Sequence, residues 1–92
     1  MPEWIQYGPL QLCICNRFEA ASLLGCSWEE VGKWVDSGLL GSVALPVPHA
    51  PGWQMRYPLY EEVCWLAEAS RQYTTLSLEQ VLWCRRKGHG NA

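Results

Sequence analysis

One segment of the chain, residues 21–40 with the sequence ASLLGCSWEEVGKWVDSGLL, limits the possible folds more than any other. Apolar residues recur at helical spacing on both sides of Gly25, and glycine commonly ends a helix in the left-handed conformation. The sequence SWEE that starts at Ser27 is a capping box, in which the Ser27 hydroxyl accepts from the Glu30 amide and the Glu30 carboxylate reaches back. We therefore predict two helices joined by a tight turn.

Capping residues define the extent of both helices. Asn16 favours a first helix over Arg17–Leu24, and Gly38 allows the second helix to end with Leu39 folded back over Trp34. From the helical spacing we expect these side chains on the buried faces of the two helices: Phe18, Ala20, Ala21, Leu23, Leu24, Trp28, Val31, Trp34 and Val35.

A β-hairpin is expected after the second helix. Residues 40–45 and 53–57 have strand character, and the prolines among residues 46–52 indicate a loop between them. The alternation typical of a half-buried strand is found at Trp53, Met55 and Tyr57. An exposed Trp53 would instead favour a protein-contact patch.

Two further helices follow in the prediction. Residues 59–70 carry Glu61 and Glu62 in the first turn, and the sequence SLEQ from Ser77 is a second capping box. The side chains that we expect to face inward are Leu59, Val63, Trp65, Leu66 and Ala67 from the first of these helices, and Leu78, Val81, Leu82 and Cys84 or Trp83 from the second.

The two ends of the chain complete the predicted domain. Residues 1–16 contain the turn signal Gly8-Pro9 and an alternating run from Leu10 to Ile14, which indicates an N-terminal arm or a short strand. A first helical segment is the alternative for this run. Residues 88–92, with the sequence GHGNA, are expected to form a flexible tail. Residues 1–92 thus form a single domain in this prediction: mainly α with a small β-hairpin, in the order of a winged helix-turn-helix.

The composition sets limits on the class of protein. Hydrophobic residues make up 49% of the 92 residues and charged residues 17%, which is typical of a globular chain. No apolar run reaches the roughly 20 residues needed to span a bilayer, so we expect no membrane partner and a cytoplasmic location. The net charge of −2 gives no general attraction to nucleic acid.

The five cysteines do not form the regular framework of a disulfide-rich domain, because their number is odd and they lie among apolar neighbours. Cys13 and Cys15 are separated by one residue, whereas zinc knuckles have roughly two to four. We expect free, mostly buried thiols, with no metal and no cofactor.

Two segments carry a resemblance to a known family. AASLLGCSWEEVGKWVDSGLL is similar to the first half of MerR-type and phage excisionase-like (Cox-like) domains, and GWQMRYPLYEEVCWL resembles the part that follows their wing. The similarity covers roughly residues 18–69. It implies a DNA-binding domain of the kind found in transcription regulators, excisionases and phage terminase small subunits, and the short chain suits an excisionase or Cox-like protein best.

The resemblance also implies which residues contact double-stranded DNA. The positions of the recognition helix are Ser27, Trp28, Glu29, Glu30 and Lys33. Arg56 stands at the exit of the wing, where the family places a phosphate contact, and His49 lies near the wing tip. The charge that this face lacks could come from Arg17 or from Arg85, Arg86 and Lys87. The chain departs from the family in having one basic residue in the recognition helix, where relatives usually have two or more.

The acidic residues of the second helix have a simpler explanation than base recognition. Carboxylates in the first turn of a helix stabilise it by roughly 0.3–1 kcal/mol each, and Glu30 completes the capping box. A Glu can also accept a hydrogen bond from cytosine N4, so direct readout of a base is chemically possible. Neutralisation of phosphates supplies most of the affinity for DNA, and this module would therefore bind weakly as a single copy.

Three hypotheses for the function follow. The first is a regulatory or architectural DNA-binding factor of a mobile element, active in transcription regulation or DNA recombination, that self-associates on DNA and contacts a recombinase. The second is a protein-interaction module on the same scaffold, such as an antirepressor or an inhibitor of a host regulator. The third is a subunit of a phage packaging complex. No catalytic constellation is recognisable in the sequence, so we expect no enzyme.

Overall fold

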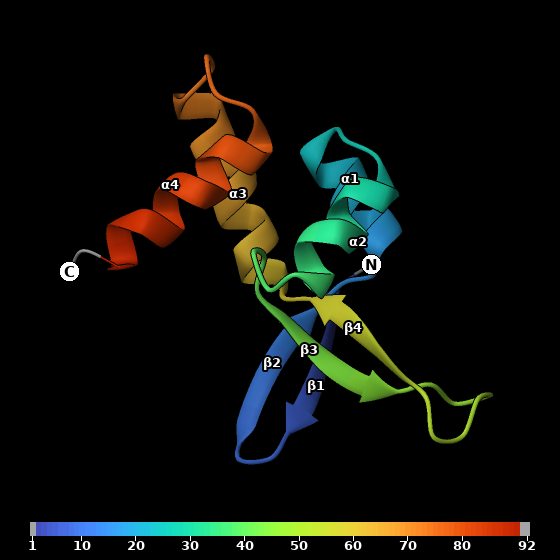
Figure 1. The fold of residues 1–92 in the computed structure, drawn as a ribbon. Helices are drawn as coiled ribbons and strands as arrows, with labels where there is room; N and C mark the ends of the chain where they lie inside the picture. Colours follow the sequence, from blue (N-terminus) through green and yellow to red (C-terminus); the bar gives the residue numbers. More distant parts are fainter. Residues whose placement is uncertain (1, 91–92) are drawn as a thin grey trace.

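Four helices and two antiparallel hairpins follow one another in the computed structural model, which describes the backbone of residues 2–90 and the side chains as far as residue 86 (Figure 1). The elements are β1 (Glu3–Tyr7), β2 (Leu10–Ile14), α1 (Arg17–Leu24), α2 (Trp28–Asp36), β3 (Ser42–Pro46), β4 (Gln54–Pro58), α3 (Tyr60–Gln72) and α4 (Leu78–Gly90). The architecture is mixed α/β rather than mainly α, because the N-terminal segment adds a second hairpin to the expected one.

The N-terminal hairpin joins β1 to β2 through Gly8 and Pro9. Gly8, the first central residue of the turn, has a φ of 60°. Pro9, the second central residue, is restricted to a negative φ. A positive φ followed by a negative one defines a type II′ turn, which matches the twist of the strands. The alternating run from Leu10 to Ile14 is confirmed as a strand. Its end is anchored to the domain, since Ile14 is buried and the Cys15 N–H donates to the Pro58 carbonyl at 3.1 Å.

Helix α1 begins and ends where its capping residues predict. The Asn16 side chain accepts from the Glu19 N–H at 2.7 Å, and the Glu19 carboxylate accepts from the Asn16 N–H at 3.1 Å. Gly25 ends the helix with a φ of 69°, in the left-handed conformation. The connection to α2 is therefore residues 25–27, which is the predicted tight turn.

Helix α2 confirms the predicted cap in part. The Ser27 hydroxyl accepts from the Glu30 N–H at 3.2 Å, but the Glu30 carboxylate lies 3.4 Å from the Ser27 hydroxyl instead of reaching the Ser27 N–H. At the other end Gly38 has a φ of 81°. The Leu40 N–H then donates to the Trp34 carbonyl. Leu40 is fully buried, and the half-buried Leu39 packs against the core that contains Trp34.

One core lies between the helices. Its buried members are Cys15, Ala20, Ala21, Val31, Trp34, Val35, Leu40, Val63, Leu66, Ala69, Val81 and Leu82. Trp34 is the largest fully buried side chain, as predicted. Helix α1 packs on α2 and α3 through the small residues Ala20 and Ala21.

Several large side chains that were predicted to be buried are exposed instead. Among the described residues these wrong assignments are Phe18, Leu23, Trp28, Met55 and Trp65, together with both alternatives offered on the last helix, Trp83 and Cys84. Trp53 is exposed as well, which is the second of the two outcomes considered for it. The 92-residue chain has more aromatic side chains than its core can enclose, and the remainder lies on the surface.

The β3–β4 hairpin has a loop built from two successive turns, each with proline in its second position. The Ala50 N–H donates to the Val47 carbonyl, and the Trp53 N–H donates to the Ala50 carbonyl. The second turn is of type II, because Pro51 precedes Gly52 and Gly52 has a φ of 87°. A third bond, from the Val47 N–H to the Trp53 carbonyl at 3.0 Å, closes the loop.

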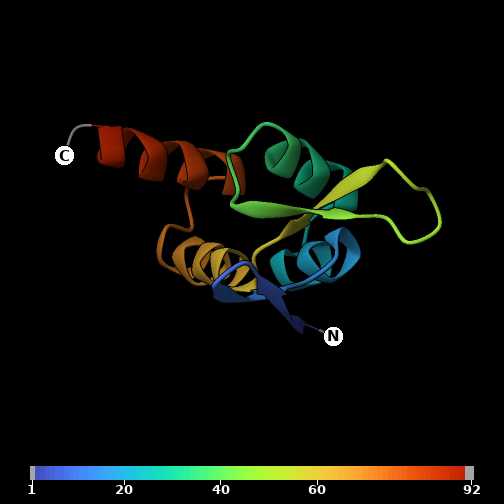
Figure 2. The same cartoon turned by 90° about the horizontal axis from the view of Figure 1, so that it is seen from below.

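Helices α3 and α4 form the other end of the domain. The second capping box is confirmed in both directions, with the Ser77 N–H donating to the Gln80 side chain at 2.7 Å and the Gln80 N–H donating to the Ser77 hydroxyl at 3.2 Å. Helix α4 continues to Gly90, so residues 88–90 of the expected tail belong to this helix, and residues 91–92 lie outside the described part. Figure 2 shows the end of α4 and the β3–β4 loop at opposite ends of the molecule. Within the described residues, no helix has the length and apolarity to cross a membrane.

Candidate binding face

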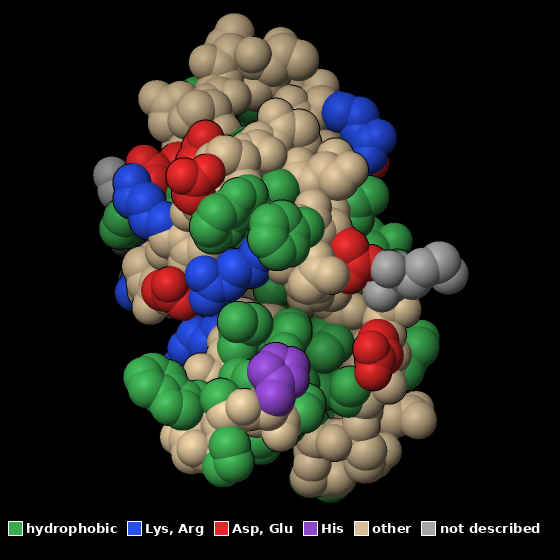
Figure 3. Space-filling model, turned by 90° about the vertical axis from the view of Figure 1, so that its right-hand side faces the viewer, with side chains coloured by type: hydrophobic (Ala, Val, Ile, Leu, Met, Phe, Trp, Pro, Cys, Tyr) green, Lys and Arg blue, Asp and Glu red, His purple; other side chains and the backbone are tan. Residues whose placement is uncertain are grey.

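A groove of about 510 Å³ lies between the starts of α1 and α2 and the β3–β4 hairpin. Apolar side chains gather over this face of the molecule, with basic side chains among them (Figure 3). The residues that line the groove are Asn16, Arg17, Phe18, Trp28, Val47, Ala50, Trp53, Gln54, Met55, Arg56 and Tyr57. Three of the residues predicted to contact DNA, Arg17, Trp28 and Arg56, are thus brought together.

The groove has an aromatic wall on the helical side. The rings of Phe18 and Trp28 are in contact, with centroids 5.4 Å apart and planes tilted by 46°. Phe18 is 64% exposed and Trp28 is 47% exposed. Large apolar side chains on the hairpin side are exposed too, with Trp53 at 71% and Met55 at 45%. An exposed apolar surface of this kind is typical of a site that binds a ligand or another macromolecule.

Arg17 lies between the two helices and is held there by Asp36. Its Nη2 donates to Asp36 Oδ1 at 2.9 Å, and its side chain is 23% exposed. The guanidinium crosses over Gly32, because a Cβ at that position would lie 2.5 Å from Arg17 Nη1. Arg17 therefore connects α1 to the end of α2, and its charge is compensated within the protein.

Lys33 is exposed on α2 but is also paired. Its Nζ lies 3.4 Å from Glu79 Oε1, on the first turn of α4. The same carboxylate oxygen accepts from the Trp34 indole N–H at 3.1 Å. That hydrogen bond first, and the charge of Lys33 second, lower the pKa of Glu79 below its usual value.

Arg56 is the groove residue whose charge is uncompensated. Its polar contact is the Ser42 hydroxyl at 3.5 Å, and within the described residues no carboxylate lies in ion-pair distance. The other residues predicted on this face are exposed and are not among those that line the groove: Ser27 at the N-cap of α2, Glu29 and Glu30 on its first turn, and His49 on the loop.

The basic residues of α4 lie elsewhere. Arg85 forms two bonds of 2.8 Å with the Glu62 carboxylate, and its guanidinium stacks over the Trp65 ring at 4.3 Å. Arg86 lies over the Trp83 ring at 5.8 Å, and the Lys87 side chain is outside the described part. Arg17 and Arg85 are both neutralised by carboxylates, so the described residues do not form a continuous basic stripe from the groove to α4.

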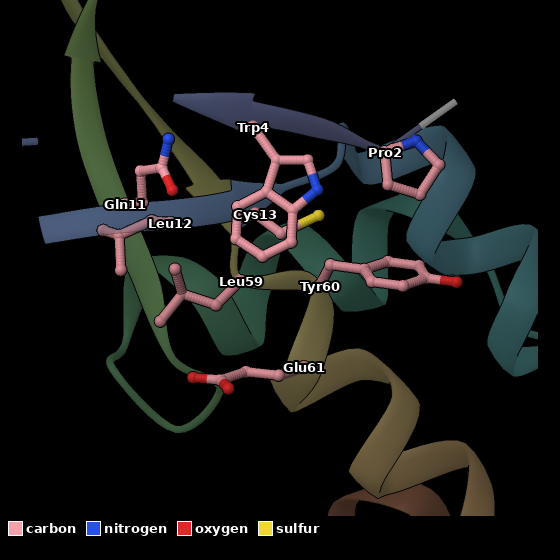
Figure 4. A pocket seen from close by; sticks show the side chains of 8 residues that line it. All are labelled: Pro2, Trp4, Gln11, Leu12, Cys13, Leu59, Tyr60 and Glu61. Carbon is pink, nitrogen blue, oxygen red and sulfur yellow. The ribbon is translucent and has the colours of Figure 1, made fainter. Parts of the chain in front are cut away.

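A second hollow, of about 500 Å³, lies beside the N-terminal hairpin. Figure 4 shows the Trp4 indole above Cys13, with the Tyr60 ring next to them. A hydrogen bond with Cys64 raises the pKa of Tyr60, and burial raises the pKa of Cys15 to about 11. Both shifts favour the protonated form, so neither group is activated as a nucleophile. Across the described residues, no three His, Cys, Asp or Glu side chains group as metal ligands would.

The sequence assigned Phe18, Trp28 and Met55 to buried faces and so missed the aromatic groove. The signal that could have found it is the number of large aromatic residues, which exceeds what a core of this size can enclose. Comparisons with protein-family models, curated proteins and solved structures give no match to this chain.

Proposed function

We propose that this protein is a small DNA-binding factor with a winged helix-turn-helix scaffold, of excisionase or Cox-like type, that acts as a multimer. One observation carries the proposal: the exposed first turn of α2 and the uncompensated Arg56 of the β3–β4 hairpin border the same face. This arrangement places a short helix and a hairpin side by side, as required to follow the major groove and the neighbouring backbone.

The charges on this face predict weak binding by a single copy. Arg17 and Lys33 are paired with Asp36 and Glu79, so among the described side chains Arg56 is the free cation beside α2. Each phosphate that a protein neutralises changes the slope of log K against log salt by about 0.9, so one or two phosphate contacts give little affinity. Several copies bound side by side would gain affinity by avidity.

The test is a salt series with the full chain on a long random duplex and on candidate operator fragments. We expect binding at low salt that strengthens cooperatively with protein concentration. Arg56→Gln is expected to reduce the salt slope by about 0.9. Arg71→Gln removes the same charge from α3, where Arg71 is paired with Glu68, and should leave the slope unchanged. Undetectable binding at low salt and high protein concentration would refute the proposal.

A second function, as a protein-interaction module on the same scaffold, is favoured by the apolar groove itself. Aromatic side chains at 47–71% exposure, as at Phe18, Trp28 and Trp53, are the kind of anchors that protein interfaces use. In this case a protein partner, and not DNA, would contact the face. Arg56→Gln would then weaken binding of the partner, and the unchanged protein would not bind DNA.

A further inference from the structure

We infer that the groove between α1, α2 and the β3–β4 hairpin binds an extended apolar peptide segment of a partner protein, with an aspartate or glutamate of that segment on Arg56. Binding of the segment does not depend on the proposed function. If the proposed function holds, the bound peptide also competes with DNA for this face; this consequence alone rests on the proposed function.

The walls of the groove supply the apolar contacts. Phe18 and Trp28 form one wall, and Trp53, Met55 and Tyr57 form the opposite one. A volume of about 510 Å³ accommodates a few side chains of an extended peptide but no folded element. Large aromatic side chains dominate interface energetics because each buries an extensive apolar area.

The groove is formed before any ligand arrives. The Asn16 capping box fixes the start of α1, where Phe18 lies, and the Ser27 cap fixes the start of α2, where Trp28 lies. Two turns and a closing hydrogen bond hold the loop that precedes Trp53. Pre-organised walls lose little conformational entropy on binding, which favours affinity from a short peptide.

The charges select the chemistry of the ligand. Arg56 is positioned for a carboxylate, since it lacks an acidic partner among the described residues and its guanidinium can bind both carboxylate oxygens. Glu29 and Glu30 are exposed on the adjacent first turn of α2, and neither forms an ion pair with a described basic side chain. These two carboxylates repel a strand with many phosphates more strongly than a peptide with a single carboxylate. A peptide therefore fits the groove better than a nucleic acid strand.

The experiment selects ligands from a library of random linear dodecapeptides displayed on phage, with the full chain as bait. Peptides that also bind Trp53→Ala are removed by counter-selection. We expect the enriched peptides to share two or more large apolar residues around one Asp or Glu. Synthetic copies should bind in solution and shift the tryptophan fluorescence of the protein.

Variants locate the peptide in the groove. Phe18→Ala and Trp53→Ala should weaken binding at least tenfold, and both remove exposed side chains, so folding is retained. Trp83→Ala removes another exposed tryptophan, on α4 and away from the groove, and should have no effect. Arg56→Gln should weaken binding of the acidic peptide but not binding of the peptide's Asp→Asn or Glu→Gln analogue.

Three results would overturn the inference. The first is that no peptide survives counter-selection. The second is that the enriched peptides are basic or bind Phe18→Ala as well as the unchanged protein. The third is that single-stranded oligonucleotides, rather than peptides, require Phe18 and Trp53, which would assign the groove to nucleic acid bases. Peptide binding without any duplex binding would refute the proposed function and leave this inference intact.

Discussion

Arg85 and Glu62 join helices α4 and α3 by two parallel charge-assisted hydrogen bonds, both 2.8 Å long. Glu62 Oε1 also accepts from the Gly41 N–H at 3.3 Å, just before β3. The Arg85 guanidinium also lies over the ring of Trp65, 4.3 Å from its centroid. One carboxylate therefore fastens the last helix, the third helix and the start of the hairpin to one another.

Replacement of Arg85 by alanine should destabilise the fold. The side chains of Arg85 and Glu62 are 31% and 19% exposed, between a surface pair and a buried pair, so we expect a loss of about 1–2 kcal/mol. Thermal unfolding followed by circular dichroism should show a Tm lower by roughly 4–16 °C. The neighbouring Arg86→Ala is the matched control, since Arg86 contacts no described carboxylate, and an equal loss in both variants would contradict the prediction.

Asp36→Asn is expected to strengthen binding to duplex DNA. Asp36 neutralises Arg17 at 2.9 Å, so its removal leaves a second free cation beside Arg56. One additional phosphate contact should steepen the salt slope by about 0.9 in a fluorescence anisotropy titration. Glu68→Gln is the control, because it removes the same charge and frees Arg71 on α3. If both variants gain equally, net charge and not the position of Arg17 controls binding.

The position of Arg17 illustrates what the sequence could not supply. Capping residues are local signals, and the starts of α1, α2 and α4 were all predicted correctly from Asn16, Ser27 and Ser77. The Arg17–Asp36 and Arg85–Glu62 pairs join residues 19 and 23 positions apart, and such contacts exist only once the helices are packed.

The burial of large side chains was predicted less well for the same reason. The hydrophobic periodicity of a sequence predicts which residues share a face of a helix, but it does not predict which neighbouring element covers that face. In α1 the neighbours contact Ala20 and Ala21, and Phe18 is left outside. The alternation over residues 53–57 misled similarly, since Trp53 and Met55 border an open groove rather than a second layer.

Glu79 should make the stability depend on pH in acid. The Trp34 indole N–H, and then Lys33, lower its pKa in the folded protein below the usual 4.5. The folded state therefore binds this proton less readily than the unfolded state, and stability is gained above pH 4.5 and lost as the pH falls through the lowered pKa. The Tm difference between the unchanged protein and Glu79→Gln should shrink as the pH is lowered from 7 to 3. A difference that stays constant over this range would rule out this role for Glu79.

The cysteines should differ widely in reactivity toward alkylating reagents. Burial, first of all, raises the pKa of Cys15 to about 11, so at pH 8 only about one in a thousand of these thiols is ionised. Cys64 and Cys84 are exposed and should be labelled first. A time course with iodoacetamide, followed by peptide mass spectrometry, should show Cys15 modified last and at the rate at which the domain opens. Addition of denaturant should abolish the difference, and modification of Cys15 as early as Cys64 in the folded protein would contradict its place in the core.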